Sequence, residues 1–168
     1  KVIFPGVGSA VSAVDTLRNR GLDNAIIEFY QSGKPLLGIC LGLQIALDRT
    51  EEGDKECLGL VAGSCHKFEF ADRSTKVPHI GWNELEIVKD HPMLKNIDSG
   101  DEFCFVHSYY AHPDNVAEIF GSTSYGDVTF TSAIGKDNFF ATQFHLEKSG
   151  KIGLKLLAEF KHWQGGSC

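Results

Sequence analysis

The sequence has little of what several large protein classes require. Its 168 residues include 16 Lys and Arg against 22 Asp and Glu, for a net charge of −6, so it lacks the clustered cations that hold a nucleic-acid backbone. Its longest apolar runs, such as residues 35–41, fall far short of the ~20 residues that span a membrane. No basic segment precedes an apolar one at the N-terminus, as a signal peptide would need. We expect a soluble, cytoplasmic protein that binds neither nucleic acid nor membrane.

Cysteines are few, odd in number and widely spread, and no C-x-x-C pair occurs. They are Cys40, Cys57, Cys65, Cys104 and Cys168. Disulfide frameworks and zinc sites normally show closer or paired spacing, so we expect reduced thiols, of which one could be reactive. The histidines show no tight metal-ligand spacing, and no phosphate-binding loop occurs. The sequence therefore predicts neither a metal nor a cofactor.

Apolar periodicity predicts an α/β fold with parallel strands early in the chain and antiparallel strands late. The expected strands cover residues 2–4, 36–39, 68–70, 85–88, 103–106, 117–120, 128–134 and 139–144. The expected helices run from Ser9 to about Gly21 and over residues 22–31, 41–47 and 151–163, with a short helical turn at 92–94. No linker, repeat or low-complexity segment interrupts the chain, so we expect one domain over residues 1–168.

The run Gly38-Ile39-Cys40-Leu41-Gly42 lies where a predicted buried strand meets a predicted helix. A nucleophile flanked by glycines at −2 and +2 in that setting is typical of a nucleophile elbow, whose sharp turn brings backbone too close for any Cβ. A sulfur at a helix N-terminus is also expected to ionise more readily. The alternative is a small apolar cysteine in a buried strand. The glycines favour the nucleophile.

His145-Leu146-Glu147 supplies a base and an orienting carboxylate for that nucleophile. On a strand, His145 and Glu147 would share one face while Leu146 points to the other. The imidazole could then take the thiol proton while Glu147 holds the ring in one tautomer. The pair is a weak signal alone, since H-x-E also occurs on exposed strands. Here it follows the buried run 139–144.

Acyl chemistry at Cys40 also needs hydrogen-bond donors for an oxyanion. The backbone N–H of Leu41, at the start of the predicted helix, is one candidate. The run Pro5-Gly6-Val7-Gly8 ends the neighbouring predicted parallel strand and could present the N–H of Val7. The alternative for this run is an ordinary strand-to-helix turn.

In this order, the motifs resemble the class I (triad) glutamine amidotransferases and, within them, the family of glutaminase subunits of imidazole glycerol phosphate synthase. The matching runs extend over nearly the whole chain: Pro5-Gly6-Val7-Gly8, Gly38-Ile39-Cys40-Leu41-Gly42-Leu43-Gln44, Val77-Pro78-His79-Ile80-Gly81-Trp82-Asn83, Phe105-Val106-His107-Ser108-Tyr109-Tyr110 and Gln143-Phe144-His145-Leu146-Glu147-Lys148-Ser149. The resemblance implies a flavodoxin-like three-layer fold with a mixed, mostly parallel central sheet.

The resemblance also implies a substrate and a partner. Glutamine would be held by residues matching the family's binding positions, namely Gly6, Gly8, Gln44, Ser108 and Tyr109. The catalytic residues would be Cys40, His145 and Glu147, with the Val7 and Leu41 N–H groups as oxyanion donors. The family forms a heterodimer with a (β/α)8-barrel cyclase that receives the ammonia and makes imidazole glycerol phosphate and aminoimidazole carboxamide ribotide for histidine biosynthesis. Partner contacts are expected at His79, Trp82, Asn83 and Lys148, although Trp82 could instead be a core residue.

Two departures from the family pattern accompany the resemblance. Leu146 stands where relatives usually have proline, and we expect its side chain to face away from the triad. The family also usually has a strand, a helix and another strand before the P-G-V-G run, about 35–40 residues on the scale of such a unit. The sequence opens directly on a strand-like run and contains only one methionine, Met93, so we expect an N-terminally truncated domain.

Two other functions are compatible with these residues. A stand-alone cysteine hydrolase of related fold would be active without a partner. A non-catalytic, partner-binding fragment would show no unusually reactive thiol.

Overall fold

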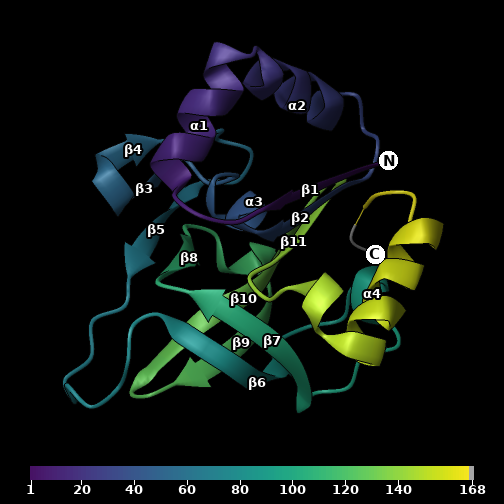
Figure 1. The fold of residues 1–168 in the computed structure, drawn as a ribbon. Helices are drawn as coiled ribbons and strands as arrows, with labels where there is room; N and C mark the ends of the chain where they lie inside the picture. Colours follow the sequence, from purple (N-terminus) through teal and green to yellow (C-terminus); the bar gives the residue numbers. More distant parts are fainter. Residues whose placement is uncertain (167–168) are drawn as a thin grey trace.

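The computed structural model describes residues 1–166 and contains short helices around a curled sheet (Figure 1). The helices are α1 (Ala10–Asn19), α2 (Leu22–Gln31), α3 (Leu41–Gln44) and α4 (Gly150–His162). Single 3-10 turns lie at η1 (Glu52–Asp54), η2 (Pro92–Leu94), η3 (Val116–Glu118) and η4 (Leu146–Lys148). Over these residues, no helix combines the length and apolar character needed to cross a bilayer.

The strands form a mixed sheet that is parallel where the chain begins. They are β1 (Val2–Gly6), β2 (Leu36–Cys40), β3 (Arg49–Thr50), β4 (Lys55–Glu56), β5 (Gly63–Lys67), β6 (His79–Ile87), β7 (Asp101–His107), β8 (Tyr109–Pro113), β9 (Ile119–Tyr125), β10 (Val128–Lys136) and β11 (Phe139–Thr142). The main order is β1-β2-β11-β10-β8-β5-β3-β4, and β6 joins β9 and β7. Strand β2 pairs parallel with β1 and β11, whereas most later pairs are antiparallel. The predicted change from parallel to antiparallel pairing is confirmed.

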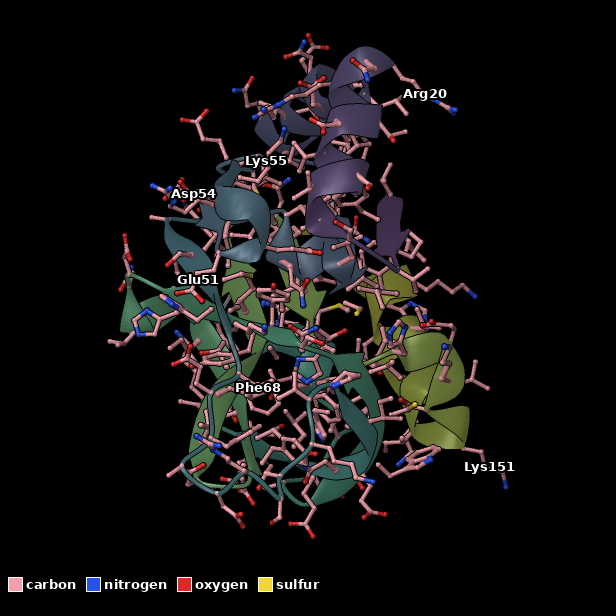
Figure 2. The ribbon with its side chains drawn as sticks, turned by 60° about the vertical axis from the view of Figure 1, so that its left-hand side comes forward. Arg20, Glu51, Asp54, Lys55, Phe68 and Lys151 are labelled. Carbon is pink, nitrogen blue, oxygen red and sulfur yellow. The ribbon has the colours of Figure 1, made fainter. Side chains whose placement is uncertain are left out.

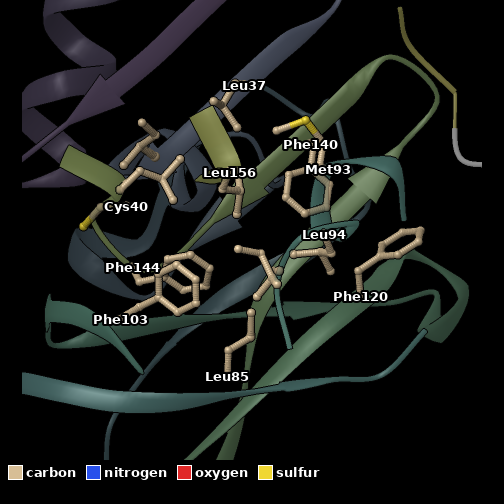
Figure 3. Close-up of a cluster of buried hydrophobic side chains, with 14 of the residues drawn as sticks. Leu37, Cys40, Leu85, Met93, Leu94, Phe103, Phe120, Phe140, Phe144 and Leu156 are labelled. Atoms are coloured by element: carbon tan, nitrogen blue, oxygen red, sulfur yellow. The ribbon is translucent and has the colours of Figure 1, made fainter. Parts of the chain in front are cut away.

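Two apolar cores lie on the two faces of the parallel strands, because successive strand residues point to opposite sides. Leu36 and Phe139 pack with α1 and α3 on one face. Leu37 and Phe140 pack with α4 on the other, together with a cluster of phenylalanines (Figure 3). Helices therefore cover both faces of the sheet, with α1 and α2 on one side and α4 on the other (Figure 1). This is the three-layer arrangement that the resemblance implied.

Most predicted elements are present, and three differ. The expected strand at 68–70 is wrong: the pairing strand is β5, Gly63–Lys67, and Phe68 follows it with its ring buried among other aromatic rings. Residues 41–47 hold only the short α3, and after Gln44 residues 45–47 pack as irregular chain in the same core as α1. The expected strand at 117–120 is a 3-10 turn followed by β9.

Candidate active site

Cys40 occupies a strained backbone position between β2 and α3. Its φ is 53° and its ψ is −103°, outside the regions that a residue with a side chain ordinarily adopts. Strain of this kind persists where the surrounding structure enforces it, and it clusters at functional sites. The sharp strand-to-helix turn predicted from the flanking glycines is therefore present.

The two glycines are required by close backbone approach, as expected. A Cβ at Gly42 would lie 1.9 Å from the carbonyl oxygen of Phe4, an impossible contact. A Cβ at Gly38 would lie 2.9 Å from the Cβ of Ala141 and 3.1 Å from the Gly42 backbone. The turn at Cys40 thus closes against both neighbouring strands, β1 and β11.

His145 and Glu147 are in contact, but they do not lie on a strand. Strand β11 ends at Thr142, and the chain turns through η4 after His145, whose carbonyl accepts hydrogen bonds from the Lys148 N–H and the Ser149 hydroxyl. His145 Nδ1 lies 2.7 Å from Glu147 Oε1. A carboxylate accepts, so Nδ1 carries the proton and Nε2 is left as the basic atom. Leu146 is fully buried in the phenylalanine core and faces away from the pair, as expected.

The Cys40 thiol is protonated at neutral pH. Burial raises its pKa to about 11, and the nearby Glu147 carboxylate adds to this, whereas the Leu41 N–H and the Gln143 side chain oppose it. The thiol donates to the carbonyl oxygen of Val106 at 3.9 Å, a contact open only to the protonated form. The expectation that a helix N-terminus would favour the thiolate is not met, because α3 has only four residues and burial dominates. Ionisation therefore depends on a base.

One cavity of about 430 Å³ brings most of the predicted site residues together. Its walls are Val7, Gly8, Cys40, Leu41, Gln44, Glu52, Pro78, Val106, His107, Ser108, Tyr109, His145 and Lys148. Val7 lines the same cavity as Cys40 because the parallel register of β1 and β2 places Gly6 beside Cys40. Glu147 lies behind His145, outside the wall. Gly6 lines the adjoining groove, and a Cβ there would lie 2.9 Å from the Cβ of Leu41.

Sequence reasoning assigned no role to three residues of this region. Glu52 lines the cavity and accepts the Ala10 N–H at 2.7 Å; nothing in its surrounding sequence indicates this, because folding of a loop brings it there. Gln143 is fully buried, with its Nε2 3.7 Å from Cys40 Sγ. His107 is 5% exposed and forms part of the cavity wall. Gln143 and His107 lie within two of the runs that resemble the family, and this was the one indication of them in the sequence.

The residues expected to contact a partner differ in exposure. His79 is 2% exposed, so its assignment as a contact residue is wrong: its ring is buried against the rings of Phe105 and Tyr125. Trp82 is 55% exposed and is therefore not the core tryptophan of the alternative. Asn83 is half-buried and donates to the Ser124 carbonyl at 2.9 Å, whereas Lys148 is exposed at the cavity rim. Across residues 1–166, no group of three or more His, Cys, Asp or Glu side chains could hold a metal ion.

Comparison with known proteins agrees with this geometry. Residues 2–162 match the family model described as "Glutamine amidotransferase class-I". The computed structure resembles a crystal structure of a glutamine amidotransferase, with a TM-score of 0.66 and 15% identity over 95% of this chain and 78% of that one. It also resembles the glutaminase domain of Trypanosoma brucei CTPS with bound acivicin, with a TM-score of 0.62 and 18% identity over 99% of this chain and 72% of that one. The chain belongs to the class I glutamine amidotransferase family.

Closer relatives narrow the assignment within that class. The imidazole glycerol phosphate synthase subunit HisH of Desulfovibrio desulfuricans is 48% identical over 164 residues, which are 95% of this chain and 75% of the relative. The HisH subunit of Neisseria meningitidis is 42% identical over 168 residues, which are 97% of this chain and 78% of the relative. By this similarity the chain is a member of the HisH family.

Proposed function

We propose that this protein is the glutaminase subunit of an imidazole glycerol phosphate synthase, which hydrolyses glutamine to glutamate and ammonia for histidine biosynthesis. The observation that carries the proposal is the strained Cys40 at a strand-to-helix turn, facing the same cavity as His145, whose ring is oriented by Glu147. Membership in the HisH family supports the choice of this enzyme among the class I amidotransferases.

The reaction proceeds through a thioester on Cys40. His145 Nε2 takes the thiol proton as the sulfur attacks the side-chain carbonyl of glutamine, and the N–H groups of Val7 and Leu41 stabilise the resulting oxyanion. His145 then returns the proton to the departing nitrogen, which leaves as ammonia. Water, deprotonated by the same imidazole, then attacks the thioester carbonyl; the carbon–sulfur bond breaks, glutamate is released, and His145 returns the proton to the Cys40 sulfur. Each proton taken by His145 is given back, so the cycle is balanced.

Glutamine is held along the cavity wall by residues from four segments. By resemblance to the family, its amide, α-amino and α-carboxylate groups are held by Gly6, Gly8, Gln44, Ser108 and Tyr109. Glu52 is the one carboxylate in the wall, so it is the group that pairs with the α-ammonium. Gly6 lies in the adjoining groove. Because it has no Cβ, its backbone can pass close to Leu41.

The ammonia passes to a (β/α)8-barrel cyclase subunit docked beside the cavity mouth. Free ammonia released into water at neutral pH would become ammonium, which is no nucleophile, so a closed transfer is needed. The exposed face of β6 and β7 carries Ile80, Trp82 and Val106, 66%, 55% and 37% exposed. Val106 also lines the cavity, so this apolar face adjoins the site. Trp82, Asn83 and Lys148 are the proposed contacts.

Glutamate release should depend on the partner. The assay compares this chain alone, with a cyclase subunit, and with that subunit plus its nucleotide ligand. We expect release only with the liganded partner. Equal release by the chain alone would contradict the coupled enzyme and favour a stand-alone hydrolase. No release under any condition, from protein with a cooperative melt, would favour a non-catalytic fragment.

Trp82→Ala should weaken association with the cyclase by about 1–2 kcal/mol or more while changing Tm little, because an exposed tryptophan in an apolar patch is a typical interface anchor. Trp163 provides a matched control: it is 5% exposed and packs on His91 and Phe160. Trp163→Ala should lower Tm strongly. Calorimetric titration and thermal melts separate the two effects. A large loss of Tm in Trp82→Ala with unchanged affinity would contradict the docking surface.

Alkylation of Cys40 should be slow at neutral pH and rise steeply in alkali. With its pKa raised to about 11 from 9.0, the thiolate fraction at pH 7 falls roughly a hundredfold below that of an ordinary thiol. The thiolate is the reactive form, so the rate should increase with pH until about pH 11. The measurement is iodoacetamide modification of the Cys40 peptide by mass spectrometry, without glutamine. A plateau reached by pH 8 would contradict a buried, protonated resting thiol.

A further inference from the structure

His79 and His107 form a buried pair beside the active site. Their strands, β6 and β7, are antiparallel, and the two residues lie directly opposite one another in the register. His79 Nδ1 lies 3.0 Å from His107 Nε2, and the two residues are 2% and 5% exposed. The reaction proposed above does not use either ring, although His107 lies in the cavity wall.

Aromatic rings surround both imidazoles. Phe105 and Tyr125 stack on His79 with ring centroids 5.0 and 3.9 Å away. Phe68 and Phe130 pack on His107 at 5.2 and 5.0 Å; Figure 2 labels Phe68 among the strands of the lower half of the molecule. Burial lowers the pKa of His79 to about 4 and that of His107 to about 3. Both rings are therefore neutral at physiological pH.

The hydrogen-bond partners determine which nitrogen of each ring carries the proton. His107 Nδ1 lies 2.8 Å from the carbonyl oxygen of Tyr109, which can only accept, so Nδ1 is protonated and Nε2 is bare. His79 Nδ1 must then donate to His107 Nε2, leaving His79 Nε2 as an acceptor. Asn83 Nδ2 faces that atom at 3.4 Å. All contacts are satisfied only when both rings are the Nδ1–H tautomer.

Hydrogen bonds through two buried side-chain amides connect the same Tyr109 carbonyl to the Cys40 sulfur. Gln44 Nε2 donates to it at 2.9 Å and, with its second hydrogen, to Gln143 Oε1 at 3.2 Å. Gln143 then has its Nε2 directed at Cys40 Sγ, 3.7 Å away. Gln44 and Gln143 are 6% and 0% exposed. Turning the Gln44 amide over would place its oxygen against the Tyr109 carbonyl, and turning the Gln143 amide over would place two NH2 groups together. The orientation of Gln44 therefore depends on Tyr109, and that of Gln143 depends on Gln44.

We infer that the His79–His107 pair is a positioning element of the glutaminase site, which holds the Tyr109 carbonyl and, through Gln44 and Gln143, orients the Cys40 thiol. The inference rests on the proposed function for its effect on turnover. An apolar pair of similar size would fill the same space without the cost of burying four ring nitrogens. The histidine pair, unlike an apolar pair, can fix the position of the Tyr109 carbonyl, which accepts hydrogen bonds from both His107 and Gln44.

Two substitutions of His79 separate this role from packing. His79→Asn keeps a donor at the position of Nδ1, whereas His79→Leu fills space without any donor. In complex with the cyclase subunit, we expect His79→Leu to lower kcat for glutamine by about 10- to 100-fold with KM changed less than about threefold. His79→Asn should restore kcat to within about threefold of the unmodified chain. Equal impairment of the two variants would overturn the inference in favour of packing.

A second readout needs no glutamine turnover. Loss of the Gln143 donor should move the midpoint of Cys40 alkylation to higher pH and slow alkylation at pH 8 in both His79→Leu and Gln143→Met. Gln143→Met keeps the volume and tests the last link if His79→Leu fails to fold. An unchanged alkylation profile in a folded variant would overturn the inference. Absence of glutaminase activity in the unmodified chain, with the profile still shifted in the variants, would instead contradict the proposed function alone.

The tautomers can be observed directly in the unmodified complex. Long-range nitrogen–proton NMR spectra at pH 7 should show both rings neutral and protonated at Nδ1. An Nε2–H signal from either histidine would show that the proposed hydrogen bonds do not form, and it would overturn the inference.

Discussion

Cys40→Ala is expected to lower glutamate release by at least about four orders of magnitude, because no other thiol of residues 1–166 lines the cavity and the thioester cannot form. Glutamine should still bind with an affinity within about threefold of the unmodified chain, since the walls that hold it are unchanged. The measurement pairs a coupled glutamate assay of the liganded complex with calorimetric titration of glutamine.

The control for this substitution is Cys57→Ala. Cys57 is partly buried and has a raised pKa like Cys40, but it lies outside the cavity. That variant should retain full activity. Residual turnover of Cys40→Ala above about 1% of the unmodified rate would exclude covalent catalysis at this residue.

His145→Asn is expected to cost about 10³- to 10⁴-fold in kcat, because the thiol, with its pKa near 11, then loses the imidazole that Glu147 orients as its base. Glu147→Gln should cost less, about 10- to 100-fold, since Glu147 is half exposed and a glutamine can turn its oxygen toward His145 Nδ1. The order of the two losses tests the assignment of base and orienting group.

Ammonium supplied at alkaline pH provides the control for this pair. The liganded complex should use added ammonia equally well with His145→Asn, with Glu147→Gln and with the unmodified chain, because ammonia bypasses this site. A loss of ammonia-dependent synthesis in these variants would indicate disrupted docking instead of disrupted glutamine hydrolysis.

The proposed catalytic residues could be located in the sequence because each lies in a short run with a recognisable spacing. Gly38 and Gly42 flank Cys40 because strands on both sides close on the turn, and this requirement is visible as glycine spacing. The predicted contact of His145 with Glu147 is present, although the expected strand is a 3-10 turn. His145 and Glu147 are two residues apart, so their side chains can meet on a strand or in a 3-10 turn. The contact was therefore predicted correctly although the predicted strand was wrong.

Elements whose stability depends on distant partners were harder to predict. Strand β5 contains Gly63 and Ser64, which have low strand propensity, and it forms because β8 and β3 supply its hydrogen bonds. The phenylalanines just beyond it suggested the wrong strand, since a buried ring is equally compatible with a packed loop. Trp82 is exposed and His79 is buried although they are three residues apart, because alternate residues of β6 face opposite sides.

The sequence by itself located the elbow, the proposed catalytic residues and the change from parallel to antiparallel strands, because glycine spacing, the H-x-E spacing and apolar periodicity can be read along the chain. The tertiary structure alone decided that the Cys40 thiol is protonated at rest, that Glu52 enters the cavity wall, and that Gln143 reaches the sulfur. It also decided that two histidines meet in the core. Burial and long-range hydrogen bonds arise only when segments far apart in the chain pack together, and local spacing carries no record of them.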